Sequence, residues 1–225
     1  MTLSRLGALL VWALVGSLGV LTACDGMHST YDEFVKDGEI VYPATPDSVA
    51  TLPGKNRLLL RMVLPADPTV TEARVFWNTG RDSLRVGFSS DQDTADVIVD
   101  GLEEGSKAFN IHTYDDRGNE SVPFSVVGRV YGETYENNLL PRFIENTTLN
   151  DSLVIEWGDP EDTSIGSRVF YEKGGQSETL FVENEEDRTV IQNFEGDQFE
   201  YTTLYKPVST SIDTFSSPAE VVMVN

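Results

Sequence analysis

Short apolar or alternating runs fill the chain from Glu39 to its C-terminal end, and Gly, Pro, Asn and Asp separate them. Strands at a spacing of roughly 8–12 residues with turn residues between them are typical of antiparallel β-sandwiches. The best helical segment, 135–143, contains Pro141, which would break a helix. The predicted strands are EIVY (39–42), RLLLRMVL (57–64), EARVFWN (72–78), DVIVD (96–100), FNIHTY (109–114), SVVGRVY (125–131), LVIEW (153–157), SRVFY (167–171), TVIQNF (189–194), FEYTTLY (199–205) and EVVMV (220–224).

The chain also repeats itself. The run RVFW at 74–77 matches RVFY at 168–171, a shift of 94 positions (168 − 74). In both halves this strand follows an acidic, Pro-containing loop and precedes a Gly-containing turn, a Val-Ile strand, a Glu-Gly turn and an aromatic strand. A period of that length fits one seven-stranded sandwich of about 100 residues. We therefore predict an all-β chain with two domains, 38–132 and 133–225.

The two halves resemble fibronectin type III modules. That family places a core Trp late in its second strand, and Trp157 in LVIEW stands at that position, whereas the first half has Met62. The family's turn before its sixth strand is matched by Leu102, Gly105 and Phe109, and less closely by Phe194, Gly196 and Phe199. The resemblance implies two tandem immunoglobulin-like sandwiches, with Trp157 in the second core.

The N-terminal segment has the pattern of a bacterial export signal. The run from Leu6 to Val20 is apolar, and Leu21-Thr22-Ala23-Cys24 follows it. These four residues resemble a lipobox, which implies cleavage before Cys24 and lipid attachment to it. A membrane span would need about 20 apolar residues, and a buried cysteine would stand here by coincidence. We expect a signal peptide (1–23), a tether (24–37) and an outer-membrane lipoprotein of the cell envelope, periplasmic or surface-exposed.

The charge balance excludes some partners. The chain has 16 Lys and Arg against 37 Asp and Glu, a net charge of −21. Nucleic-acid binding requires clustered cations, so it is not expected. Anionic lipid would repel the protein surface, which leaves the lipid on Cys24 as the attachment to the membrane.

Candidate catalytic and metal-binding residues are scarce. The two histidines are His28, in the tether, and His112, in an aromatic strand without a supporting motif for a nucleophile. The single cysteine leaves too few ligands for zinc. Acidic loops near Asp91 and Asp159 could hold calcium, but solvated turns are the favoured interpretation because a dedicated loop spacing is missing. The sequence therefore predicts no enzyme, no metal and no cofactor.

Aromatic residues are the best candidates for a binding site. Alternation along 74–78 turns Val75 and Trp77 inward and Arg74 and Phe76 outward, and the same holds for the strand around Phe170. The outward Phe rings could form a contact surface or lie under neighbouring Arg stems, and the second interpretation is favoured. The more accessible stacking candidates for a neutral glycan are Tyr131 and Tyr135 near the domain junction and Tyr114 and Tyr205 at strand ends.

A resemblance to one family extends over nearly the whole predicted mature chain. The chain is similar to Bacteroidota lipoproteins with domain of unknown function 4998, through KDGEIVY (36–42), PGKNR (53–57), RVFWN (74–78), YD (114–115), GNES (118–121), VYG (130–132), FEYTTLY (199–205) and IDTF (212–215). That family has no assigned activity or catalytic residues. It implies a location near outer-membrane glycan-uptake systems.

These observations favour a non-enzymatic, lipid-anchored accessory protein that binds extracellular glycan in a polysaccharide-uptake system. The alternative is a structural spacer, or a subunit that contacts an outer-membrane partner protein and binds no small ligand. Convergence of exposed Trp and Tyr on one face would support the first hypothesis. Dispersal of these rings would support the second.

Overall fold

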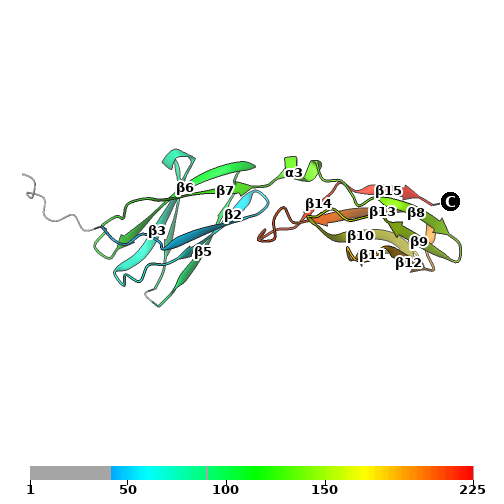
Figure 1. The fold of residues 1–225 in the computed structure, drawn as a ribbon, viewed down its shortest axis with the longest axis horizontal. Helices are drawn as coiled ribbons and strands as arrows, with labels where there is room; N and C mark the ends of the chain where they lie inside the picture. The colour runs from blue at the N-terminus through cyan, green and yellow to red at the C-terminus, as the bar shows by residue number, and fades with distance from the viewer. Residues whose placement is uncertain (1–41, 90, 225) are drawn as a thin grey trace, which may run out of the picture. The chain divides into compact units, whose positions relative to one another are not determined.

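β-strands dominate the part of the chain that the computed structural model describes, residues 42–89 and 91–224 (Figure 1). The predicted signal peptide, the tether with Cys24 and His28, and residues 39–41 of the first predicted strand lie outside the described residues. No helix within the described ranges has the length and apolar character needed to cross a membrane.

The first half of the described chain contains two antiparallel sheets. The three-stranded sheet has the order β1-β2-β5, and the four-stranded sheet has the order β4-β3-β6-β7. The strands are β1 (Ser48–Pro53), β2 (Arg57–Val63), β3 (Val70–Trp77), β4 (Asp82–Gly87), β5 (Thr94–Asp100), β6 (Gly105–Asp115) and β7 (Phe124–Val130), with the 3-10 turn η1 (Asn78–Gly80) between β3 and β4.

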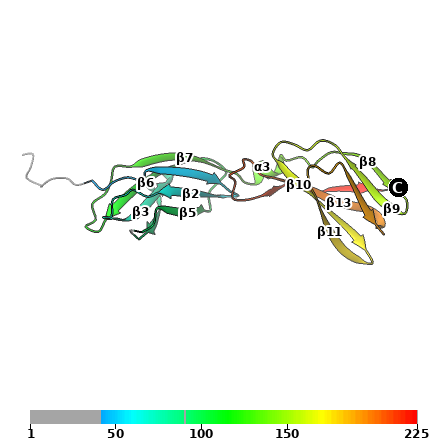
Figure 2. The same ribbon diagram turned by 60° about the horizontal axis from the view of Figure 1, so that its bottom comes forward.

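The second half repeats this arrangement. Its sheets have the orders β12-β9-β8 and β11-β10-β13, and both β14 and β15 pair with β13 (Figure 2). The strands are β8 (Ile144–Leu149), β9 (Ser152–Trp157), β10 (Ser164–Lys173), β11 (Gln176–Val182), β12 (Arg188–Gln192), β13 (Glu195–Tyr205), β14 (Phe215–Ser216) and β15 (Glu220–Met223). A three-stranded sheet packed on a four-stranded sheet is the fibronectin type III arrangement, so the predicted fold class is confirmed.

Alternation of side chains explains why the sequence forms these strands. In β5, Ala95, Val97 and Val99 are buried while their neighbours are exposed. Successive side chains of a strand point to opposite faces of the sheet, so one apolar face covers the core and the other meets water. β-Branched residues on the inner face fit such a half-buried, pleated surface.

Each half has its own hydrophobic core. The first core gathers buried side chains from β2, β3, β5, β6 and β7, including Met62, and the second gathers those of β9, β10, β12 and β13, including Trp157. Trp157 is only 3% exposed, and its indole N–H donates to the hydroxyl of Thr189 at 2.9 Å. The prediction that Trp157 lies in the core is confirmed, and Met62 occupies the corresponding strand position in the first half.

The β10–β11 hairpin shows how turn chemistry sets a register. Gly174 and Gly175 both have positive φ, 60° and 72°. Two-residue hairpin turns of this hand require positive φ at both positions, which glycine adopts without a Cβ penalty. The turn directly pairs Lys173 with Gln176 and places Phe170 opposite Thr179.

Side chains near residues 53–57 and 131–136 contact the segment 212–215. The guanidinium of Arg57 donates twice to the carboxylate of Asp213, with Nε at 2.8 Å from Oδ2, and the amide of Lys55 donates to Oδ2 at 2.8 Å. The amide of Ile212 donates to the carbonyl of Pro53 at 2.9 Å. These bonds join residues that stand more than 150 positions apart in the chain.

A short helix, α3 (Glu133–Asn137), follows β7 and overlaps the first residues of the segment 135–143, the best helical candidate in the sequence. The carboxylate of Glu104 accepts from the amides of Thr134 and Tyr135 at 2.8 and 3.0 Å. An acidic acceptor at a helix start satisfies amides that have no partner within the helix. The helix ends before Pro141, as expected from proline's missing N–H.

The division at 132/133 stays a prediction that the two halves, produced separately, can test. We expect residues 38–132 and 133–225 each to give a β-rich circular dichroism spectrum and a cooperative melt, because each contains a complete core. The first should melt at the lower temperature, since Met62 replaces a core Trp. Each should melt below the intact chain because the bonds to Asp213 are lost. A random-coil spectrum from both pieces would contradict the division.

The Arg57–Asp213 pair gives a second prediction, on pH. Hydrogen bonds from the Arg57 guanidinium lower the pKa of the Asp213 carboxyl, with partial burial acting in the opposite direction. A lowered folded-state pKa stabilises the fold above the ordinary aspartate value of about 3.9, and this stabilisation is lost as the pH falls below it.

We therefore expect Asp213→Asn to lower the unfolding free energy by about 1 kcal/mol at neutral pH, because the pair is partly exposed and screened by solvent. The deficit should shrink as the pH falls through the lowered pKa of Asp213, because a protonated Asp213 is neutral like the asparagine. Urea titrations of wild type, Asp213→Asn and the exposed control Asp151→Asn across this pH range measure it. A deficit that grows on acidification would contradict the assignment.

Candidate functional site

Two of the predicted stacking tyrosines, Tyr131 and Tyr135, lie together but pack against a third ring. Their ring centroids are 4.8 Å apart, and both meet the buried Phe215 edge-on, at 5.9 and 5.2 Å. Partial burial raises the pKa of the Tyr135 hydroxyl. Both side chains are half-buried, so much of their ring surface is engaged by protein.

Tyr114 lies elsewhere, on β6, and a cation covers its ring. The guanidinium carbon of Arg74 is 4.4 Å from the ring centroid, within the range of a cation–π contact. Glu72 fixes this arginine by accepting from its Nε at 2.8 Å, and the same carboxylate oxygen lies 3.0 Å from Nε of Arg85. One face of the Tyr114 ring is therefore covered by Arg74.

The expectation that Tyr205 is accessible is wrong. Tyr205 is 3% exposed, its hydroxyl donates to the carbonyl of Leu140 at 2.5 Å, and burial raises its pKa. Tyr205 continues the buried alternate set of β13 formed by Phe199, Tyr201 and Thr203, so strand alternation directs its ring inward. Its place at the strand end, on which the expectation rested, does not expose it.

The remaining described Trp and Tyr rings are also dispersed. Trp77 packs against the first core near Phe109, and Tyr171 packs against the second core near Phe194. Tyr201 is buried against Trp157 and donates to the carbonyl of Arg142 at 2.8 Å. Within residues 42–89 and 91–224, Tyr42 alone among the tyrosines is exposed. A convergent platform of exposed Trp and Tyr is therefore not found in the described part.

The predicted orientation of the two RVF strands is confirmed. Val75 and Val169 are fully buried, whereas Phe76 and Phe170 point away from the cores. The two outward rings differ in their surroundings: Phe76 is half-buried edge-on against the His112 ring at 5.7 Å, and Phe170 is 37% exposed. The outward Phe ring of the repeat is thus covered in the first half and exposed in the second.

His112 has the partners of a structural residue. Its Nδ1 lies 2.7 Å from the Glu120 carboxylate and 3.1 Å from the carbonyl of Ser121. The Ser121 hydroxyl donates to the carbonyl of Val122 and accepts from the amide of Thr113. A nucleophile activated by His112 would need its hydroxyl on the imidazole, and no such bond occurs in the described residues.

Acidic side chains do not gather into an evident metal site. Within the described ranges, no group of three or more His, Cys, Asp or Glu side chains is arranged to hold an ion. The acidic loops near Asp91 and Asp159 are interpreted as turns. In the first loop the Asp91 carboxylate accepts a hydrogen bond from the Ser89 hydroxyl, and this bond lowers the pKa of the Asp91 carboxyl.

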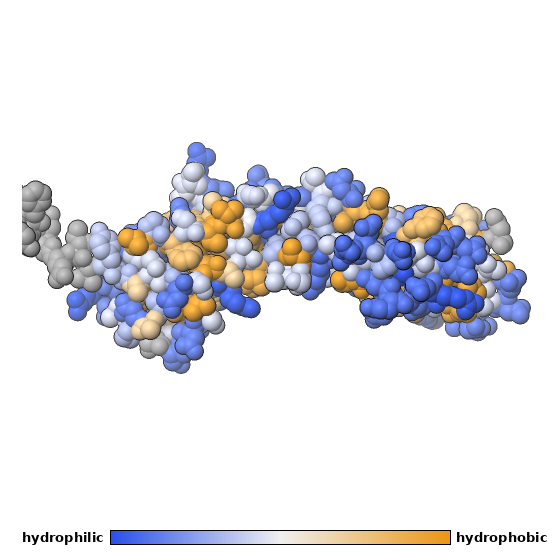
Figure 3. Space-filling view, viewed as in Figure 1, coloured by the Kyte–Doolittle hydropathy of each residue, from blue (hydrophilic) through white to orange (hydrophobic). Residues whose placement is uncertain are grey.

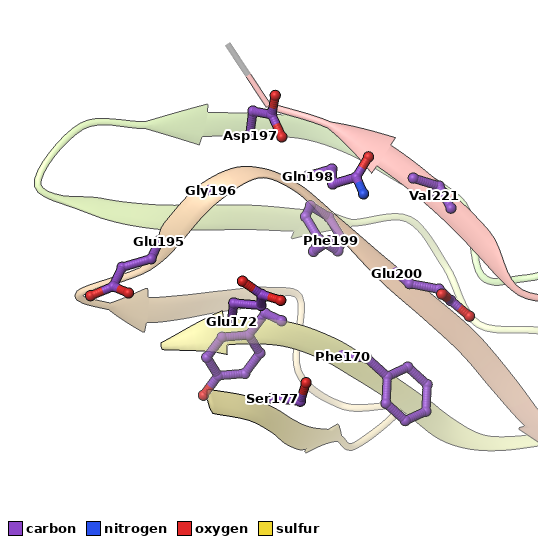
Figure 4. Close-up of a pocket in the computed structure, with 11 residues that line it drawn as sticks. Phe170, Glu172, Ser177, Glu195, Gly196, Asp197, Gln198, Phe199, Glu200 and Val221 are labelled. Atoms are coloured by element: carbon purple, nitrogen blue, oxygen red, sulfur yellow. The ribbon is translucent and has the colours of Figure 1, made fainter. Parts of the chain in front are cut away.

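A shallow groove of about 320 Å³ lies on the second half, over the open Phe170 ring (Figure 4). Phe170 and Glu172 come from β10, Glu200 from β13 and Val221 from β15, and Glu195 lies at the start of β13. Register places Phe170 beside Glu200, and Glu200 beside Val221. The sequence identified Phe170 as outward but gave no signal for Val221, whose strand could be placed next to β13 only once the sheet order was known.

The groove is acidic as well as apolar. Glu172, Glu195, Asp197 and Glu200 line it, and no Lys or Arg is among its lining residues. None of these four carboxylates forms an ion pair within the described residues. The arrangement can therefore accept a cation and an apolar group side by side.

Comparisons with known proteins give the family of the chain and two solved structures to which it is similar. No curated protein matches the chain. A two-domain fibronectin type III segment of chicken tenascin matches 80% of this chain and 99% of its own length at 16% identity, with a TM-score of 0.33. The FN1–FN3 domains of chicken CNTN1 match over 83% of this chain and 66% of their own length at 10% identity, with a TM-score of 0.41. Both scores are low, so the fold assignment depends on sheet topology. A family model matches residues 24–215, and the chain belongs to that family, DUF4998, a domain of unknown function.

Proposed function

We propose that the chain is a lipid-anchored, non-catalytic module of the cell envelope that acts by contacting a partner protein. The observation that supports this most is the dispersal of its Trp and Tyr rings. Tyr131, Tyr135 and Tyr114 are engaged by Phe215 or Arg74, and Tyr205 is buried. Two sandwiches without a stacking platform suit a structural or interaction subunit better than a glycan-binding module.

The anchoring part of the proposal rests on the sequence. Leu21-Thr22-Ala23-Cys24 follows an apolar run, and the family match begins at residue 24, where the mature chain is expected to start. The strong negative charge disfavours direct contact with anionic lipid. A lipid on Cys24 would hold the sandwiches at a membrane surface while leaving their sides open to other proteins.

The non-catalytic part rests on the described side chains. Both contacts of His112, with Glu120 and with the Ser121 carbonyl, are made by Nδ1, and among the described residues no hydroxyl is hydrogen-bonded to its imidazole. The acidic groove near Phe170 is open, and its carboxylates project from strands of a single sheet. Glycoside hydrolysis needs two carboxyl groups that flank a substrate within a cleft, so this surface is poorly suited to it.

Glycan binding, the sequence-based expectation, remains the second candidate and has a direct test. Affinity electrophoresis of the purified full chain through gels with neutral polysaccharides should show no retardation if the interaction proposal holds. Retardation that Tyr131→Ala or Tyr114→Ala removes would instead support a stacking site. In that case removal of one ring should cost about 1–3 kcal/mol, by analogy with base stacking.

The interaction proposal itself is tested by native electrophoresis of membranes solubilised in mild detergent. We expect the wild-type chain to migrate in an assembly larger than its own 24.9 kDa, with a defined second protein in constant ratio. Migration of the chain alone from its own membranes, combined with retardation by a polysaccharide, would contradict the proposal.

A further inference from the structure

The outer face of the sheet β11-β10-β13-β15 differs from its counterpart in the first half in what covers it. On the first half, the His112 ring lies edge-on to Phe76, Glu120 pairs with His112, and Glu72 pairs with Arg74 and Arg85. These contacts cover much of the Phe76 ring within the fold itself. The surface around Phe76 therefore has little left to offer a partner.

The second half lacks these covering residues. Across the sheet, Arg74 on β3 lies opposite His112 on β6. The corresponding arginine of the repeat, Arg168 on β10, lies opposite Thr202 on β13. A threonine side chain is too short to cover a neighbouring Phe ring. Phe170 is accordingly 37% exposed, and the strand beyond Glu200 adds Val221 and Met223, which are 55% and 58% exposed.

Carboxylates stand between these apolar groups. Glu200 lies directly between Phe170 and Val221 in the sheet, Glu172 lies opposite Glu195 across β10 and β13, and Asp197 follows on β13. The described residues provide these four carboxylates with no ion-pair partner, although Arg168 lies on the same face. Figure 3 shows apolar patches among largely hydrophilic surface on the side of the second half that faces the viewer.

We propose that this face is the docking site for a Lys- and Arg-rich segment of a partner protein. The aliphatic stems of such residues lie on apolar surface while their charged ends reach carboxylates, and a cation over the Phe170 ring adds a cation–π contact. A purely apolar partner would bury four carboxylates without partners at high cost. The occupant is thus cationic with interspersed apolar residues. This inference deepens the proposed function and rests on it.

The test uses the full chain in detergent and a fluorescein-labelled synthetic peptide of alternating lysine and valine. Fluorescence anisotropy should report binding that weakens with added salt. Glu172→Gln combined with Glu200→Gln should weaken binding about fivefold or more, since each exposed ion pair contributes up to about 1 kcal/mol. Phe170→Ser should weaken it to a similar extent.

The matched controls remove the same charge or a similar apolar area elsewhere. Asp116→Asn combined with Asp151→Asn changes the net charge equally, and Val127→Ser removes an exposed apolar residue of β7. These controls should bind like wild type, and all variants should keep the wild-type melting temperature. Equal weakening by the Asp controls would show attraction by net charge alone and would overturn the site, as would an absence of binding.

A parallel measurement separates this inference from the proposed function. If the native assembly persists in the Glu172→Gln, Glu200→Gln chain, the partner docks elsewhere, and only the site assignment fails. If wild type forms no assembly in its own membranes, the proposed function fails as well. If the assembly dissociates in this variant and persists in the Asp control, both hold.

Discussion

Changing Trp157 to alanine will lower the unfolding free energy of the second half by about 3–5 kcal/mol, the range for removing a large aromatic from a packed core. Trp157 is buried, packs edge-on against Tyr201 at 5.4 Å and donates to Thr189. The variant leaves a cavity in the core, and the Thr189 hydroxyl loses the indole N–H that donates to it. Both effects destabilise the folded state. Chemical denaturation followed by circular dichroism measures the loss.

Trp77→Ala is the matched control, because the same side chain is removed from a half-buried position on the rim of the first core. Its cost should be smaller, and it should fall on the first half. If the halves unfold separately, Trp157→Ala will lower one transition and leave the other nearly unchanged. Equal losses for both tryptophans would contradict the assignment of Trp157 as the core anchor.

Changing Cys24 to serine will transfer the whole chain from the membrane fraction to the soluble fraction. The proposed thioether to lipid would require the Cys24 sulfur, and the net charge of −21 provides no alternative attraction to anionic lipid. Labelling with a fatty-acid analogue should mark wild type and leave the variant unmarked.

A second variant separates the position of the cysteine from its mere presence. Cys24→Ser combined with Ser29→Cys restores one thiol five positions later (29 − 24), outside the tetrapeptide that resembles a lipobox. This chain should also remain unlabelled and soluble. Labelling of either variant equal to wild type would show that the chain is held in the membrane by something other than Cys24.

Several strands of both sandwiches could be predicted from the sequence because one face of each is continuously apolar. The runs at 57–64, 96–100, 153–157 and 189–194 correspond closely to β2, β5, β9 and β12. The repeated RVF run also predicted correctly which side chains face the cores. Burial of alternate residues imposes a pattern that sequence displays directly.

Four strands were missed because few of their side chains are buried. β1, β4, β8 and β11 are polar on much of their surface, as in IENTTL (144–149) and QSETLFV (176–182). They have little apolar surface to bury, so their sequences lack strong alternation, whereas the edge strands β5 and β12 bury alternate residues and were predicted. The positions of the four missed strands became evident only from pairing with β2, β3, β9 and β10.

The candidate site was only partly predictable. The outward direction of Phe170 followed from alternation, but its neighbours Glu200 and Val221 come from strands 30 and 51 positions away (200 − 170 and 221 − 170). The bonds between Arg57 and Asp213 are likewise set by tertiary structure. The interpretation of Tyr205 as accessible was wrong because its position at a strand end was given more weight than the inward alternation that it shares with Phe199 and Tyr201.

The most direct test of the account is a photocrosslinking measurement on the lipidated chain in its own membrane. A benzoylphenylalanine at position 170 should give one discrete adduct with a protein that contains a Lys- and Arg-rich segment, and Glu172→Gln with Glu200→Gln should abolish it. The same group at position 127, on exposed β7 of the first half, should give none. Absence of an adduct at position 170, or equal adducts at both positions, would contradict the claim that this chain acts by docking a partner on its second sandwich.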